Sequence, residues 1–122
     1  MATKVLAIRG ATVVEHDSVA DITERVAELV GEMMSRNKLA SQDIISAIFT
    51  ATDDIVSMFP ATAARKSFMA DVPLLCAREL SVEGAIERCI RVMMHVETSL
   101  SRQELQHIYL HEAITLRDEP RN

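Results

Sequence analysis

Hydrophobic and polar residues alternate along two stretches of the chain, residues 4–13 and 88–98. A period of two residues is typical of β-strands, whose successive side chains point to opposite faces of a sheet. We therefore predict a strand over each stretch. In the second, one face would be wholly apolar, and the other would carry Cys89, Arg91, Met93 and His95.

Apolar residues recur with helical spacing after Ser18, which has an acidic residue three positions later at Asp21. This pattern predicts a capped amphipathic helix that ends near Asn37. Proline favours the first turn of a helix, so a second helix is expected over residues 60–67. A third, short helix is expected over residues 101–106.

Three further segments have the composition of strands. Residues 44–52 form a compact apolar run, expected to be buried on both faces, and residues 72–76 form a shorter one that leads into a polar exit over 77–84. Residues 107–111 alternate, which would place His107, Tyr109 and His111 on one face. A flexible tail is expected from about residue 117.

These elements predict an α+β fold with a single mixed sheet covered by helices on one face. A chain of 122 residues can form one domain around one core, so residues 1–122 are expected to be a single domain. The second sheet face would carry Arg9, Arg91, Met93 and Tyr109. That mixture is too polar for a core and too apolar for bulk water, which indicates a subunit contact or a ligand site.

Composition narrows the possible partners. A net charge of −5 argues against nucleic acid, which normally requires a basic surface. No apolar stretch is long enough for a signal peptide or a membrane span, so a cytoplasmic location is expected, with Cys76 and Cys89 as reduced thiols. Ten of the 13 basic residues are arginines, which suit carboxylates and phosphates, so a local pocket for a small anion remains possible.

The usual catalytic patterns are weak in this sequence. His107 and His111 would lie about 13 Å apart in a strand, too far to share a metal ion, and the three glycines are too scattered for a phosphate loop. Cys76 could be a nucleophile, but a lone cysteine is more often an apolar filler. Arg91 is different, because an arginine within an apolar strand must meet an acid, a subunit partner or an anionic ligand.

Several short motifs resemble, in joint order and spacing, the monofunctional chorismate mutases of the trimeric α/β-barrel type. The resemblance runs from residue 7 to residue 117. It is carried by Ile8-Arg9-Gly10-Ala11-Thr12, Phe59-Pro60-Ala61 with Ala64-Arg65, Val72-Pro73-Leu74 with Cys76 and Glu79, Cys89-Ile90-Arg91-Val92-Met93-Met94, and His107-Ile108-Tyr109-Leu110 with Leu116-Arg117. Two departures are Thr62, where some relatives have lysine, and the ending Arg117-Asp118-Glu119-Pro120.

The resemblance implies a homotrimer, ferredoxin-like in its chains and barrel-like as a whole, with active sites between subunits. It implies an isomerase that rearranges chorismate to prephenate in phenylalanine and tyrosine biosynthesis, with no metal or cofactor. Arg9, Arg91 and Tyr109 would hold the enolpyruvyl carboxylate, and Arg91 would also reach the ether oxygen. Glu79 and Cys76 would contact the ring hydroxyl end. The pocket would be lined by Phe59, Ala61, Leu74, Leu75 and Leu116. The ring carboxylate would be attracted by Arg65 and Arg117.

Absence of a catalytic triad is consistent with that reaction, which is concerted within one molecule and needs only a compact conformer and well-placed donors. Fold alone does not fix function, so two rivals remain. One is a trimeric ligand-binding or deaminase-like protein of similar architecture. The other is a regulatory domain that binds an aromatic-pathway metabolite without turnover.

Overall fold

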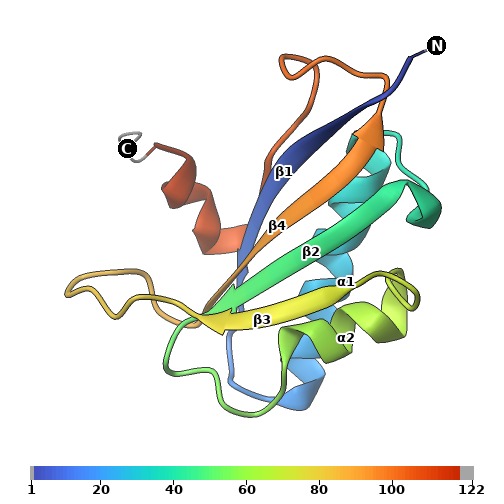
Figure 1. Ribbon diagram of the computed structural model, residues 1–122. Coiled ribbons are helices and arrows are strands. Elements are labelled where there is room, and N and C mark those ends of the chain that lie inside the picture. The colour runs from blue at the N-terminus through green and yellow to red at the C-terminus, as the bar shows by residue number, and fades with distance from the viewer. Residues whose placement is uncertain (1, 119–122) are drawn as a thin grey trace.

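The computed structural model describes residues 2–118 and contains one five-stranded mixed sheet (Figure 1). The strand order is β3-β2-β4-β1-β5. β4 lies antiparallel to both β1 and β2, whereas the β2–β3 and β1–β5 pairs are parallel. This confirms the single mixed sheet. The strands are β1 (Lys4–Val13), β2 (Ile44–Ala51), β3 (Leu74–Arg78), β4 (Cys89–Thr98) and β5 (Ile108–Tyr109).

Two α-helices, α1 (Val19–Arg36) and α2 (Pro60–Ser67), lie on the same side of the sheet (Figure 1). The Ser18 side chain caps α1 by accepting a hydrogen bond from the backbone nitrogen of Asp21, and Pro60 opens α2, as predicted. The apolar stripe of α1 is fully buried against the inward-facing residues of the strands, among them Ile8, Phe49 and Met94. Hydrophobic burial of this face stabilises the layered fold.

Gly10 lets α1 approach β1 closely. A Cβ atom at this position would lie 2.4 Å from Met33 Sδ and 3.2 Å from Leu29 Cδ1, both on α1. The absence of a side chain therefore sets the depth at which the helix packs on the strand. This contact fixes the layer beneath Arg9 and Ala11, which flank Gly10 and face the other side.

The second sheet face is largely open. Its exposed apolar side chains include Val5, Ile48, Leu75 and Met93, with exposed fractions of 59%, 39%, 63% and 37%. Burial of β2 on both faces was therefore a wrong prediction for the single chain, because no layer covers this side of Ile48. Among residues 2–118, cover on this face is limited to one end, where the 3₁₀ helix η2 (His111–Asp118) packs Ala113 against Ala11, Val13 and Cys89.

The chain after β4 differs from the prediction. Residues 101–106 form a turn and not a helix. Asn37, buried at the end of α1, explains the difference: its Oδ1 accepts from the backbone nitrogen of Gln106 and its Nδ2 donates to the carbonyl of the same residue. These bonds occupy the backbone N–H and carbonyl of Gln106, so a helix from residue 101 does not continue through Gln106. Another 3₁₀ turn, η1 (Ser41–Asp43), precedes β2.

The strand expected over residues 107–111 is only two residues long. Leu110 donates its backbone N–H to the carbonyl of Ala11, and His111 then adopts a φ of 55°, which turns the chain into η2. His111 Nε2 lies 2.8 Å from Glu28 Oε1 on α1, so His111 does not share a face with Tyr109. The strand predicted over 72–76 begins and ends two residues later, at Leu74 and Arg78.

Residues 117 and 118 continue η2, and the predicted flexible tail otherwise lies outside the described residues. In the portion of the chain that is described, no helix is long and apolar enough to cross a membrane.

Candidate active site

Arg91 is the centre of a polar group on the open sheet face. It lies on β4 directly opposite Thr50 of β2 on one side and Ala11 of β1 on the other. Glu79 directly follows β3, and its backbone nitrogen donates to the carbonyl of Ala51 at 3.0 Å. These pairings bring the side chains of Thr50, Glu79 and Arg91 together at one end of the sheet.

The contacts within this group are short. Arg91 Nε lies 3.3 Å from Glu79 Oε2, and the Thr50 hydroxyl donates to the same oxygen. The Arg91 side chain is 43% exposed and that of Glu79 is 19% exposed. The Nε atom of Arg91 is nevertheless buried, and its 3.3 Å contact with Glu79 is an ion pair without the geometry of a hydrogen bond. The ion pair therefore anchors the inner part of the guanidinium and leaves its outer end accessible.

Arg9 and Tyr109 lie on the same face beside this group. Arg9 is paired with Met93 of β4, and its backbone nitrogen donates to His107 Nδ1 at 2.9 Å. Tyr109 is paired with Ala11, which separates it from Arg91 by one strand. Leu116 of η2 packs with Tyr109 over Ala11. The structure thus places Arg9, Glu79, Arg91, Tyr109 and Leu116 around one patch of the open face.

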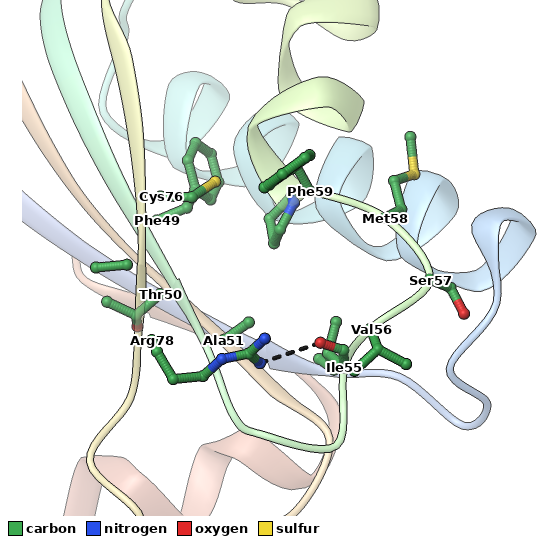
Figure 2. Close-up of a pocket in the computed structure, with 12 residues that line it drawn as sticks. Phe49, Thr50, Ala51, Ile55, Val56, Ser57, Met58, Phe59, Cys76 and Arg78 are labelled. Atoms are coloured by element: carbon green, nitrogen blue, oxygen red, sulfur yellow. Dashed lines mark hydrogen bonds between the residues drawn. The ribbon is translucent and has the colours of Figure 1, made fainter.

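A cavity of about 460 Å³ lies at the edge of the sheet, between β2, β3 and the loop over residues 55–59, and Thr50 also belongs to its lining (Figure 2). Cys76 and Phe59 line it, and Phe59 is 71% exposed. Arg78, also in its lining, donates from Nη1 to the carbonyls of Thr52 and Ile55 and so holds the loop against β3. Arg78 was not among the residues predicted for the site, because it lies in the polar exit of β3 with no local pattern to mark it.

Asp17 fixes the same loop from outside the cavity. Its Oδ1 accepts from the backbone nitrogens of Val56 and Ser57 at 3.1 and 3.0 Å, and its carbonyl accepts from the Ser57 hydroxyl at 2.8 Å. The first part of the loop, residues 55–57, is therefore held both by Arg78 and by Asp17. Nothing in the local sequence indicated this role, because the partners lie 39 and 40 residues apart.

The two groups of candidate residues lie on opposite sides of β3. Leu74 and Cys76 point toward the helices and pack against the main core, whereas Leu75 is exposed on the open side, in the row of Ile48. Ala61 is buried in the core, and Arg65 is exposed on α2. The side chain of Arg117 lies outside the described residues. One chain therefore does not bring Phe59 and Cys76 to Arg91 and Glu79.

Cys89, at the start of β4, is buried beneath η2. Burial raises the pKa of its thiol to about 11, against the opposing influence of the nearby Arg91 guanidinium. A thiol with this pKa holds its proton at neutral pH, so Cys89 is poorly suited to act as a nucleophile. Both cysteines are free.

Fold and site together define a small α+β protein that carries Arg9, Arg91, Glu79 and Tyr109 together on an open sheet face. The chain matches the family described as chorismate mutase type I over residues 5–120. It belongs to that family, and it is an enzyme of the isomerase class.

Individual relatives agree with this membership. Chorismate mutase AroH of Bacillus subtilis (strain 168) is 36% identical over 111 residues, which are 90% of this chain and 87% of the relative. Chorismate mutase AroH of Thermus thermophilus is 42% identical over 111 residues, with 90% and 91% covered. A solved chorismate mutase from Clostridium thermocellum superposes with a TM-score of 0.87 at 43% identity, covering 90% of this chain and 98% of that one.

Proposed function

We propose that this chorismate mutase rearranges chorismate to prephenate over the open sheet face, in sites completed by a neighbouring copy of the chain. The observation that carries the proposal is the placement of Arg91 beside Glu79 and Thr50, with Arg9 and Tyr109 on the same face. Two arginines and a phenol form a donor set that matches a carboxylate and an ether oxygen.

The rearrangement breaks the ether carbon–oxygen bond while a new carbon–carbon bond forms between the enolpyruvyl methylene and the ring. No proton is transferred in this step, and no redox or covalent partner is needed. As the ether bond lengthens, negative charge grows on its oxygen. The outer end of the Arg91 guanidinium would stabilise that charge, while Arg9 and Tyr109 bind the enolpyruvyl carboxylate and hold the compact conformer.

Glu79 is proposed to contact the ring hydroxyl end of the substrate, as Cys76 would from the neighbouring copy. Phe59, Ala61, Leu74, Leu75 and Leu116 would form the apolar boundary, and Arg65 and Arg117 would attract the ring carboxylate. Because the net charge is −5, attraction of a dianion must come from this local cluster of arginines and not from the overall field of the protein.

A homotrimer with shared sites is supported by two features. Exposed Ile48, Leu75 and Met93 form an apolar row across the open face, which a second copy would remove from water. The residues expected to surround one substrate also lie on opposite sides of β3, so a complete site needs the edge of another chain. We place the enzyme in the cytoplasm, in phenylalanine and tyrosine biosynthesis.

The direct experiment is to mix purified protein with chorismate and follow the loss of its ultraviolet absorbance, with prephenate identified as the product. Arg91→Ala serves as the control for contaminating activity. Turnover by the wild type that is absent in the variant supports the proposal. Binding of chorismate without any loss of absorbance would instead identify a regulatory domain and contradict it.

A further inference from the structure

Thr50 has no assigned role in the proposed mechanism, yet its hydroxyl is hydrogen-bonded to the Glu79 carboxylate. The oxygen that accepts this bond, Oε2, is the same atom that lies 3.3 Å from Arg91 Nε. Thr50 is also the direct cross-strand partner of Arg91. The Thr50 hydroxyl on β2 therefore bonds to the Glu79 carboxylate, and Thr50 lies directly across from Arg91, the cation of the same ion pair.

We propose that Thr50 is a positioning residue that fixes the Glu79 carboxylate and, through it, the orientation of the Arg91 guanidinium. The inference rests on the proposed function, because it assigns Thr50 to the same site. A residue outside the expected substrate contacts would thus set the geometry of the group that stabilises the breaking bond.

The physical basis is the way in which a carboxylate and a guanidinium pair. Left free, the two groups favour a bidentate arrangement that occupies two guanidinium nitrogens. The Thr50 hydroxyl occupies one lone pair of Oε2, and the backbone bond from Glu79 to Ala51 limits how far the carboxylate can turn. Held this way, Glu79 makes its contact with Arg91 at Nε, which leaves the terminal nitrogens available to a substrate.

Burial strengthens this effect. Glu79 is 19% exposed and Arg91 Nε is buried, so water competes weakly with the Thr50 hydroxyl for the carboxylate. Hydrogen bonds to charged groups are stronger than those between neutral groups, and more so where water is excluded. Much of the contribution would appear as orientation of Arg91 in the transition state, and less of it as affinity for chorismate.

The test compares Thr50→Val, which keeps the β-branched shape but removes the hydroxyl, with Thr50→Ser, which keeps the hydroxyl. We expect Thr50→Val to lower kcat about tenfold to a hundredfold with KM changed less than about threefold, and Thr50→Ser to keep most of the turnover. Equal losses in both variants would overturn the inference, because they would show that packing and not the hydroxyl matters.

A double-mutant cycle with Glu79→Ala separates this inference from the proposed function. If Thr50 acts through Glu79, adding Thr50→Val to Glu79→Ala should lower kcat by less than about twofold further. If Thr50→Val lowers kcat as much in the Glu79→Ala background as in the wild type, the role of Thr50 is overturned and the proposed function is not. The same holds if Thr50→Val is as active as the wild type while Glu79→Ala is impaired. Absence of chorismate turnover in the wild type overturns the proposed function, and this inference with it.

Discussion

Arg91 combines an accessible guanidinium end with a buried Nε atom 3.3 Å from Glu79 Oε2. Removing a preorganised donor from a water-poor site costs about 2.7 to 4 kcal/mol, or a hundredfold to a thousandfold in turnover. We therefore expect Arg91→Ala to lower kcat at least a hundredfold and to change KM much less. Arg91→Lys should recover only part of the loss, because lysine keeps the charge without the planar fork.

Steady-state kinetics of both variants, with circular dichroism as the folding control, measure this effect. Retention of more than about a third of wild-type kcat by Arg91→Ala would show that the residue is structural and that the assigned mechanism is wrong.

The raised pKa of the Cys89 thiol predicts that the free energy of unfolding falls at alkaline pH. Its pKa is about 11 in the folded chain and 9.0 for an unperturbed thiol, so the unfolded state loses its proton first as pH rises. Stability that is fully present below pH 9 should therefore fall by about 2 to 3 kcal/mol between pH 9 and 11. Urea unfolding of the wild type beside Cys89→Ala measures this. Identical pH dependence of the two proteins would contradict the prediction.

Some of these residues could be recognised from the sequence and others could not. Arg91 stands out because it interrupts an alternating apolar strand, where a buried cation would need a partner, whereas Arg9 was noted as part of the mixed second sheet face and through the family resemblance. Glu79 was identified only through the family resemblance, since a lone carboxylate after a strand is ordinarily solvated. Thr50 and Asp17 gave no signal, because their partners are brought close only by the parallel pairing of β3 and by the loop after β2.

At the scale of elements, the loop over residues 55–59 is held by Asp17 and leads to Phe59. Asp17→Ala removes the acceptor of two backbone N–H groups, so the loop should sample more conformations and its contact with substrate should weaken. We expect KM for chorismate to rise about tenfold while kcat changes less than about threefold.

Ser57→Ala is the matched control, because it removes only the hydroxyl bond to the Asp17 carbonyl. Its KM should stay within about twofold of the wild type. A normal KM in Asp17→Ala, or the same rise in both variants, would show that the carboxylate does not position this loop.

Most elements were predicted correctly, the short helix α2 and the strand β2 among them, and the errors lie mainly in the segment after β4. β1, β4 and α1 carry enough residues for their patterns to be unambiguous. The segment over residues 101–111 has local signals for a helix and a strand, but Asn37 binds the backbone of Gln106 and His111 turns the chain with a positive φ. Contacts between distant residues decided its structure, and local patterns do not contain them.

At the scale of the whole molecule, the two faces of the sheet differ, because helices cover one and leave the other largely exposed. The helix-covered face forms the buried hydrophobic core, whereas the open face exposes both an apolar row and the candidate catalytic arginines. The sheet itself was predictable from period-two patterns. The division of the candidate site by β3 was not, because the side of an edge strand that each residue faces depends on its exact register.

Subunit complementation tests the central claim most directly, namely that Arg91 of one chain acts with Phe59 and Cys76 of another. Arg91→Ala chains and Phe59→Asp chains are each expected to be inactive, the second because a carboxylate would repel the dianionic substrate. Phe59 is 71% exposed, so Phe59→Asp should fold. After co-refolding of equal amounts, an intact site forms where a Phe59→Asp chain supplies Arg91 and its neighbour, an Arg91→Ala chain, supplies Phe59. Each position is filled by the right chain about half of the time, so about a quarter of the sites should be intact.

We predict that mixed assemblies regain about a quarter of wild-type activity from two inactive parents. Mixing without unfolding, so that subunits do not exchange, is the control and should restore nothing. If co-refolded mixtures that contain hybrid trimers, verified by mass, remain as inactive as either parent, each chain holds its own complete site and the shared-site mechanism is wrong.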